Sequence, residues 1–116
     1  TTLNYGTVAA WSQWWSFKEV FGRCYDSLKT HQKPMMLTEF GSLAVGGDRA
    51  AWFRDALQSL QKDFTLVKAV VFYHAATDNT TTYKALDWTF DDDTAVVSAV
   101  RKAIRTDDKY HSRLPP

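Results

Sequence analysis

The stretch from Lys33 to Ser42 constrains the fold most, because an apolar run within it ends in one acid followed by a glycine. Pro34 has no N–H to donate to a sheet ladder, so it suits the first residue of a strand. The apolar residues after it favour a strand that is buried on both faces, as in parallel sheets. Glu39 stands at the far end of this strand, where α/β proteins gather their functional groups. A helix cap or a surface ion pair with a lysine is the structural alternative for Glu39.

A helix is predicted from Ser16 to about His31. Ser16 and Glu19 form an S-x-x-E capping box, and Trp15 and Val20 stand where a hydrophobic staple would close over it. One face of this helix is expected to be buried, because apolar residues recur at helical spacing. These residues are Phe17, Val20, Phe21, Cys24, Tyr25 and Leu28.

Cys24 is the chain's one cysteine, which excludes an internal disulfide and a cysteine-rich metal site. Its place on the apolar helical face predicts a small buried side chain and argues against a reactive thiol.

The second half of the chain repeats the alternation of helix and strand. Asp48 is a plausible N-cap of a second helix, and residues 66–73 form an apolar run with only Lys68 interrupting it. A last helix is expected to begin near Asp93 or Thr94. The predicted buried stripes are Phe53, Ala56, Leu57, Leu60 and Phe64 in the second helix, and Val96, Val97, Val100 and Ile104 in the last.

The segments between these elements are expected to be loops with little regular structure. A short extended piece is predicted around residues 5–8, a glycine-rich loop over 41–47, a polar loop over 75–83 and a short extended return over 86–90.

Helices that alternate with fully apolar strands predict an α/β fold with a parallel sheet. Two or three parallel strands leave sheet edges and one sheet face that this chain cannot cover by itself. The chain has 116 residues, whereas a complete (β/α)8 barrel needs roughly 250. We therefore expect residues 1–116 to be a single partial domain, the last two to three βα units of such a barrel, with a polar tail over 106–116.

The charge balance excludes some classes of partner. The formal net charge is +1 and the charges are interspersed, which argues against a nucleic-acid or membrane-surface footprint. No apolar run reaches the length of a membrane span. The expected partner is uncharged.

Four segments together resemble a known enzyme family. They are Trp15 to Phe17 at the start of a helix, Lys33 to Gly41, Gly46 to Trp52, and Val67 to Phe72. This series resembles the C-terminal third of family 26 glycoside hydrolases, which are (β/α)8 enzymes that cut β-mannans and, in some branches, mixed-linkage β-glucans. The resemblance covers most of residues 5–104, and a strand ending in Glu-Phe-Gly also fits other retaining glycosidases of this barrel clan.

The resemblance implies that Glu39 lies at the end of barrel strand 7 and is the catalytic nucleophile. A second glutamate, the acid/base, closes strand 4 in this family, and no stretch of the chain matches it. Retaining hydrolysis needs two carboxyl groups about 5–5.5 Å apart. The expectation is therefore a fragment of a retaining endo-β-glycosidase that is inactive alone, needs no cofactor or metal, and acts on a β-linked polysaccharide in an extracellular or cell-envelope setting.

Several other residues are candidates for substrate binding. Tyr5 stands where the family commonly places a tyrosine that orients the nucleophile, and an ordinary loop tyrosine is the equal alternative. Tyr73 is favoured over Phe72 as the aromatic beneath the sugar, because the two alternate across the strand. His74 is either a sugar contact or a hydrogen-bonding loop residue. Trp88 is either a sugar platform or a lid over a helix.

The other tryptophans and the acidic run have simpler readings. Trp11 and Trp14 are possible subsite walls, whereas Trp52, like Phe53 and Phe64, is expected in the core. Residues 91–93 are three successive aspartates that suit a helix start.

Two other hypotheses stay open. A non-catalytic carbohydrate-binding or structural remnant of a glycosidase barrel would keep the aromatics without the acid/base. Alternatively, two copies of the chain could pair through their open sheet edges.

Overall fold

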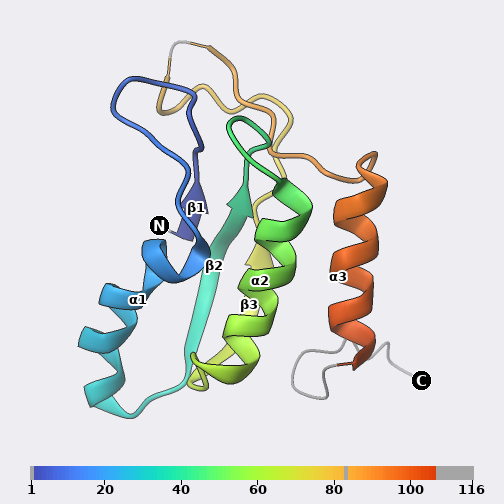
Figure 1. Ribbon diagram of the computed structural model, residues 1–116. Coiled ribbons are helices and arrows are strands. Elements are labelled where there is room, and N and C mark those ends of the chain that lie inside the picture. The colour runs from blue at the N-terminus through green and yellow to red at the C-terminus, as the bar shows by residue number, and fades with distance from the viewer. Residues whose placement is uncertain (1, 83, 107–116) are drawn as a thin grey trace.

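The computed structural model describes residues 2–82 and 84–106, and Figure 1 shows their arrangement. Three parallel strands form one sheet in the order β1-β2-β3: β1 (Thr2–Asn4), β2 (Met35–Ser42) and β3 (Val67–Phe72). The helices are α1 (Phe17–Leu28), α2 (Arg49–Lys62) and α3 (Thr94–Thr106), with a 3-10 turn η1 (Lys29–His31) after α1. The predicted α/β fold with parallel strands is confirmed. Apart from residue 106, the polar tail predicted over 106–116 lies outside the described residues.

All three predicted helix starts are confirmed, and caps define those of α1 and α2. Ser16 Oγ accepts a hydrogen bond from the Glu19 amide at 3.2 Å, and Glu19 Oε1 accepts one from the Ser16 amide at 3.3 Å, so the capping box is complete. Asp48 caps α2 by accepting a 3.1 Å hydrogen bond from the Ala51 amide. These bonds satisfy amide groups that have no partner inside the helix.

The three helices share one hydrophobic core with one face of the sheet. Phe40 of β2 is completely buried and lies against rings from two helices, Phe17 of α1 and Trp52 of α2. Val96 of α3 completes the same core, beside the aromatic ring of Phe53 and its neighbours. The predicted core roles of Trp52, Phe53 and Phe64 are confirmed.

Three residues expected in the core are exposed. Cys24 is exposed, and Leu28 and Ile104 also lie largely in solvent. In α1 the line Phe17, Phe21 and Tyr25 alone reaches the core. The predicted buried stripe of α1 is therefore too wide. Cys24 lines an open groove between α1 and β2 and does not pack into the core.

The sheet face opposite the helices carries exposed apolar side chains. Met36 of β2 is 60% exposed and Val71 of β3 is 48% exposed, although both strands were predicted to be buried on both faces. Within the described residues, no helix or strand covers that face, although Trp88 packs over its carboxyl end beside Gly41. This arrangement agrees with the expectation that the sheet is part of a larger α/β domain.

The first strand is earlier than predicted. The extended piece expected at residues 5–8 is a turn, and pairing occurs at residues 2–4, where Thr2 lies opposite Phe40 and Asn4 opposite Ser42. β2 also runs to Ser42, so Glu39 lies three residues before its end and not at its last position.

The pairing of β2 with β3 has two irregularities that cancel. One step from Met35 to Met36 spans two residues of β3, and the three steps from Leu37 to Phe40 span two. Because a strand alternates its faces, the second irregularity lets Leu37 and Phe40 both reach the helix-side core. Thr38 and Glu39 between them are exposed.

Candidate active site

The loops that follow the three strands meet at the carboxyl end of the sheet, at the top of Figure 1. Asn4, at the end of β1, holds this region together and is completely buried. Its Nδ2 donates to Ser42 Oγ at 2.9 Å, and its Oδ1 accepts from the amides of Gly6 at 3.2 Å and Trp15 at 3.0 Å. One side chain thus fastens both ends of the loop after β1 to the end of β2.

A cluster of four aromatic rings occupies this end of the sheet, and we call it the mouth cluster: Tyr5, Trp11, Tyr73 and Trp88. Trp88 is its centre, only 1% exposed, with edge-to-face contacts to Tyr5 at 5.0 Å and to Tyr73 at 5.5 Å between ring centroids. Trp11 contacts Tyr5 at 5.6 Å and is 60% exposed. Such edge contacts stabilise ring pairs beyond simple burial.

Asp78 holds the central ring of the mouth cluster, that of Trp88, by a hydrogen bond. The carboxylate is 4% exposed and accepts hydrogen bonds from Trp88 Nε1 at 2.9 Å, from Thr80 Oγ1 at 2.6 Å and from the Thr80 amide at 3.0 Å. These hydrogen bonds, the Thr80 hydroxyl first, hold the pKa of Asp78 below its usual value although burial acts in the opposite direction. Asp78 is therefore an ionised anchor at neutral pH.

Glu39 is exposed on β2, and its backbone oxygen accepts a hydrogen bond from the Thr2 hydroxyl. The negative charge of Glu39 acts on one member of the mouth cluster, Tyr73, by raising its pKa. Burial raises the pKa of Tyr73, and the negative charges of Asp78 and then Glu39 raise it further. The Tyr73 hydroxyl therefore stays protonated at neutral pH, and it hydrogen-bonds to the Asp78 carboxylate, whose pKa this bond helps to lower.

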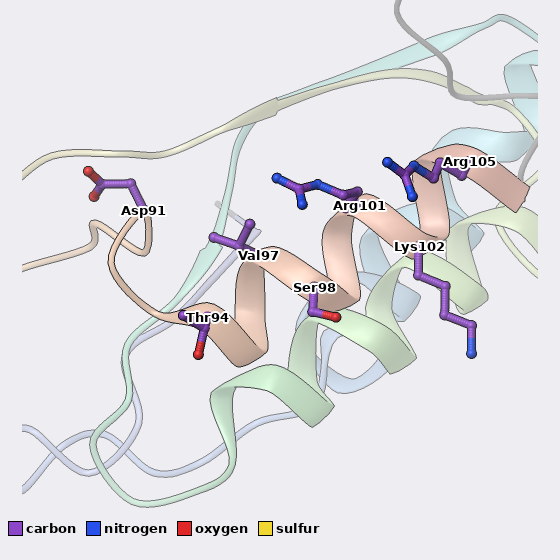
Figure 2. A pocket seen from close by; sticks show the side chains of 7 residues that line it. All are labelled: Asp91, Thr94, Val97, Ser98, Arg101, Lys102 and Arg105. Atoms are coloured by element: carbon purple, nitrogen blue, oxygen red, sulfur yellow. The ribbon is translucent and has the colours of Figure 1, made fainter.

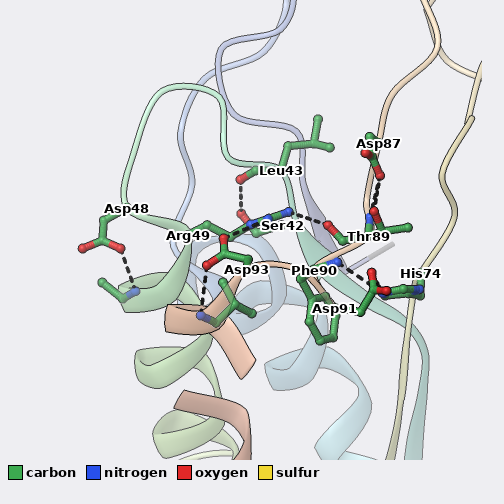
Figure 3. Close-up of polar contacts among 12 residues, drawn as sticks. Ser42, Leu43, Asp48, Arg49, His74, Asp87, Thr89, Phe90, Asp91 and Asp93 are labelled. Atoms are coloured by element: carbon green, nitrogen blue, oxygen red, sulfur yellow. Dashed lines mark hydrogen bonds and ion pairs between the residues drawn. The ribbon is translucent and has the colours of Figure 1, made fainter. Parts of the chain in front are cut away.

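His74 follows Tyr73 just beyond the end of β3, and its ring contacts Phe90 instead of the mouth cluster. Its Nε2 accepts a 3.1 Å hydrogen bond from the Phe90 amide, and its ring lies edge-on to the Phe90 ring at 4.9 Å. The Asp91 carboxylate is 3.6 Å from the same nitrogen. Figure 3 shows His74 beside Phe90 and Asp91, at the start of the segment that leads into α3.

Arg49 ties the beginning of α2 to that same segment (Figure 3). Its guanidinium donates to the Thr89 carbonyl oxygen at 3.0 Å and to Asp93 Oδ2 at 2.9 Å. The hydrogen bond from Arg49 holds the pKa of Asp93 below its usual value. Asp93 Oδ1 also accepts from the Val96 amide at 3.2 Å, so the helix-start interpretation of the acidic run is confirmed for this residue.

The structure brings together four of the six residues that the sequence singled out. Tyr5, Trp11, Tyr73 and Trp88 form the mouth cluster, and Glu39 lies near Tyr73, whereas His74 faces the helix layer. The Tyr5 hydroxyl is 3.1 Å from Thr81 Oγ1. None of these positions tests a role in catalysis or substrate binding, so those roles stay predictions.

Sequence reasoning missed Asn4 and Asp78. Both are buried polar side chains with several hydrogen-bond partners. Nothing local marks them, because Asn4 precedes a turn and Asp78 stands in a polar stretch that has the composition of an ordinary loop.

A separate groove of about 580 Å³ runs along α3, and Figure 2 shows Arg101 and Arg105 projecting from the same side of that helix. The remaining lining residues are mostly small or polar, with Asp91 at one end. This groove shares no residue with the mouth cluster.

The described residues show neither a metal centre nor a membrane-spanning helix. Among residues 2–82 and 84–106, no group of three or more His, Cys, Asp or Glu side chains is placed to hold a metal ion. Within the same ranges, every helix is too short or too polar to cross a bilayer.

Comparison with known proteins gives one informative similarity. No protein-family model matches the sequence. Over 102 residues, or 87% of the chain, the sequence is 36% identical to Endoglucanase H from Acetivibrio thermocellus. The chain spans only 11% of the length of that protein. Over most of its own length, the chain is therefore homologous to one part of an endoglucanase.

Proposed function

We propose that this chain is part of a retaining β-glycosidase in which Glu39 is the nucleophile. The similarity to Endoglucanase H supports a glycosidase in general. The observation that carries the assignment of Glu39 is its position on β2 near Tyr73, whose pKa its charge raises. An exposed carboxylate whose charge acts on an aromatic side chain of the mouth cluster supports attack by Glu39 on a sugar ring, with the second carboxyl group supplied from outside this chain.

The mouth cluster supplies the surroundings that such a nucleophile needs. A nucleophilic carboxylate must stay ionised, and neighbouring hydrogen-bond donors favour the ionised form. Tyr73 is the proposed donor, and its hydroxyl, which bonds to Asp78 in this structure, would turn to Glu39. Tyr5 and Trp88 then serve mainly to position Tyr73, because Trp88 is buried between the two tyrosine rings.

The general acid/base belongs to another part of the parent polypeptide. Glu19 and Glu39 are the two glutamates of the chain, and the Glu19 carboxylate is engaged in the capping box of α1. Asp78 is unsuitable because its pKa is lowered, whereas a general acid near neutral pH needs a raised one. We therefore propose that this chain alone does not hydrolyse its substrate.

The remainder of a (β/α)8 barrel is the proposed cover for the open sheet face. Exposed Met36 and Val71 provide an apolar surface there, and β1 and β3 are both edge strands. In a closed barrel that face would be the interior, and both edges would be paired. Under this proposal β2 is the seventh barrel strand, as the resemblance to family 26 implies.

The proposed substrate is a β-linked glucan or mannan. The resemblance to family 26 favours mannan as the substrate. The name of the similar protein, an endoglucanase, makes glucan an equal candidate. Because such substrates are insoluble or bulky polymers, we propose that the parent protein works outside the cell or at its envelope.

The test is Glu39→Gln in the polypeptide that contains this chain. We expect the rate of hydrolysis to fall by at least about 10³-fold, while polysaccharide binding and the thermal unfolding midpoint stay near the parent values. Glu19→Gln is the matched control, because it changes the other glutamate of the chain. That variant should keep its activity.

Mass spectrometry provides a second readout of the nucleophile. A 2-deoxy-2-fluoro glycoside of the preferred sugar should leave a covalent sugar on the peptide that carries Glu39. Undiminished hydrolysis by Glu39→Gln, or labelling of a different residue, would refute the assignment. Polysaccharide binding without any hydrolysis by the parent would favour the non-catalytic remnant instead.

A further inference from the structure

A groove of about 600 Å³ opens beside the mouth cluster, and we call it the loop groove. It lies between the loop after β1 and the segment before Trp88, the two segments that lie together at the top of Figure 1. The lining residues that matter here are Thr7, Trp11, Thr81, Thr82 and Lys84.

One wall of the loop groove offers an aromatic surface. Trp11 is 60% exposed, and the ring contact recorded for it among the described residues is the edge-type contact with Tyr5, at an interplanar angle of 63°. Most of the indole is therefore open to the groove and to solvent.

The opposite wall offers hydroxyl groups and one amine. Thr81 Oγ1 is 3.1 Å from the Tyr5 hydroxyl, which joins the two walls, and Thr82 Oγ1 donates to the Lys84 carbonyl oxygen at 2.6 Å. The described lining residues include no acid and only one formal charge, that of Lys84. Such a lining suits a ligand that is neutral and rich in hydroxyls, with an apolar face to lie on the indole.

A chain of ring contacts links the loop groove to Tyr73, whereas Glu39 does not line the groove. Trp11 contacts Tyr5, Tyr5 contacts Trp88, and Trp88 contacts Tyr73. A ligand on Trp11 is thus three ring contacts from Tyr73, so it would occupy a different place from the sugar that reacts.

We propose that the loop groove is a subsite for a neutral sugar unit of a β-linked chain, remote from the bond that is cleaved. The sugar's C–H face lies on Trp11, and its hydroxyls bind Thr7, Thr81 and Lys84. This inference rests on the proposed function, because it takes the same polysaccharide to run from the region of Glu39 across the mouth cluster.

The experiment measures oligosaccharide binding by calorimetry in the polypeptide that contains this chain, with Glu39→Gln to prevent turnover. The probes are β-1,4-linked gluco- and manno-oligosaccharides from the disaccharide to the hexasaccharide. Trp11→Ala should weaken binding of the longest ligands roughly tenfold and leave the shortest unchanged. Trp11→Tyr should restore most of the loss, because it keeps an aromatic face.

Trp15→Ala is the matched control. Trp15 is an exposed tryptophan of the same loop that does not line the groove, so its removal should change no affinity. Equal binding by Trp11→Ala and the parent at every length would overturn the subsite, as would binding of neither oligosaccharide series. Preferential binding of an acidic sugar through Lys84 would overturn its neutral character.

The outcomes separate this inference from the proposed function. If Glu39→Gln still hydrolyses polysaccharide but Trp11→Ala loses affinity for long ligands, the nucleophile assignment fails and the subsite stands. If Glu39→Gln is inactive and Trp11→Ala binds normally, the subsite fails and the nucleophile assignment stands.

Discussion

The indole Nε1 of Trp88 lies 2.9 Å from the Asp78 carboxylate, and both groups are almost completely buried. This hydrogen bond closes a ten-residue loop within the long connection between β3 and α3. The loop is closed a second time by reciprocal backbone hydrogen bonds between Asp78 and Leu86, at 2.9 and 2.7 Å. The connection between β3 and α3, which contains Trp88, is therefore held in one conformation by side-chain and backbone hydrogen bonds.

The first prediction concerns acid stability. The pKa of Asp78 is lowered in the folded protein, so its contribution to stability is present above its unfolded pKa and is lost as the pH falls below about 4. Asp78→Asn should flatten this part of the dependence of unfolding free energy on pH, measured by urea denaturation. Asp78→Ala should also lower stability near neutrality by about 1–3 kcal/mol, because the Trp88 N–H loses its buried partner. An unchanged pH profile in Asp78→Asn would contradict the assignment.

The second prediction concerns the link between α2 and α3. Arg49→Ala removes hydrogen bonds to the Thr89 carbonyl and to Asp93, and should lower the free energy of unfolding by roughly 1–3 kcal/mol. Arg49→Lys should recover only part of this, because an ammonium lacks the planar fork that reaches both acceptors. Arg54→Ala is the control on the same helix. Arg54 is exposed with a 3.6 Å contact to Asp55, so the loss should be within about 0.5 kcal/mol.

The third prediction compares two glycines. Gly6 has φ +62°, and a Cβ there would collide with the Val45 carbonyl oxygen, so Gly6→Ala should destabilise the protein by more than about 1 kcal/mol. Gly22 lies inside α1, and a Cβ there would meet nothing within 4 Å. Gly22→Ala should therefore stabilise the protein by about 0.5–1 kcal/mol. Thermal unfolding of the two variants would show shifts of opposite sign, and shifts of the same sign would argue against the described loop.

The fourth prediction tests the proximity of Glu39 and Tyr73. The charge of Glu39 raises the pKa of Tyr73, after the larger effects of burial and Asp78. Glu39→Gln removes that charge, so the pKa of Tyr73 should fall towards its usual value without reaching it. The ultraviolet absorbance of tyrosinate, followed in an alkaline titration with Tyr73→Phe as the reference, would report the change. A titration that Glu39→Gln leaves unaltered would place the two side chains apart.

Local signals predicted the helices and the two long strands well. The capping box at Ser16 and the N-cap at Asp48 are encoded by residues within one turn, and both are present. The strand β1 was placed too late, because three residues carry no recognisable alternation and its pairing partner lies 38 positions away, as between Thr2 and Phe40. A pattern of helical spacing likewise could not show that Cys24 and Ile104 would have no neighbour to pack on.

The candidate site was predicted in part for similar reasons. The aromatic residues stand out by type, so the sequence alone indicates Tyr5, Tyr73 and Trp88 as candidates. The structure adds the ring contacts between them. Asp78 was missed because its burial follows from a tryptophan ten positions later in the sequence. The orientation of His74 towards Phe90 depends on the same long connection, and no residue next to His74 encodes it.

The extra step of β2 between Leu37 and Phe40 has an evolutionary consequence. Thr38 could be replaced by another amino acid while the helix-side anchors on both sides stay in place, whereas the proposed role of Glu39 as nucleophile requires a glutamate at its position. Deletion of one codon between Leu37 and Phe40 would leave them two positions apart, the spacing that puts both side chains on one face of a regular strand. Relatives of this chain should therefore tolerate the loss of Thr38, with the core residues on both sides kept.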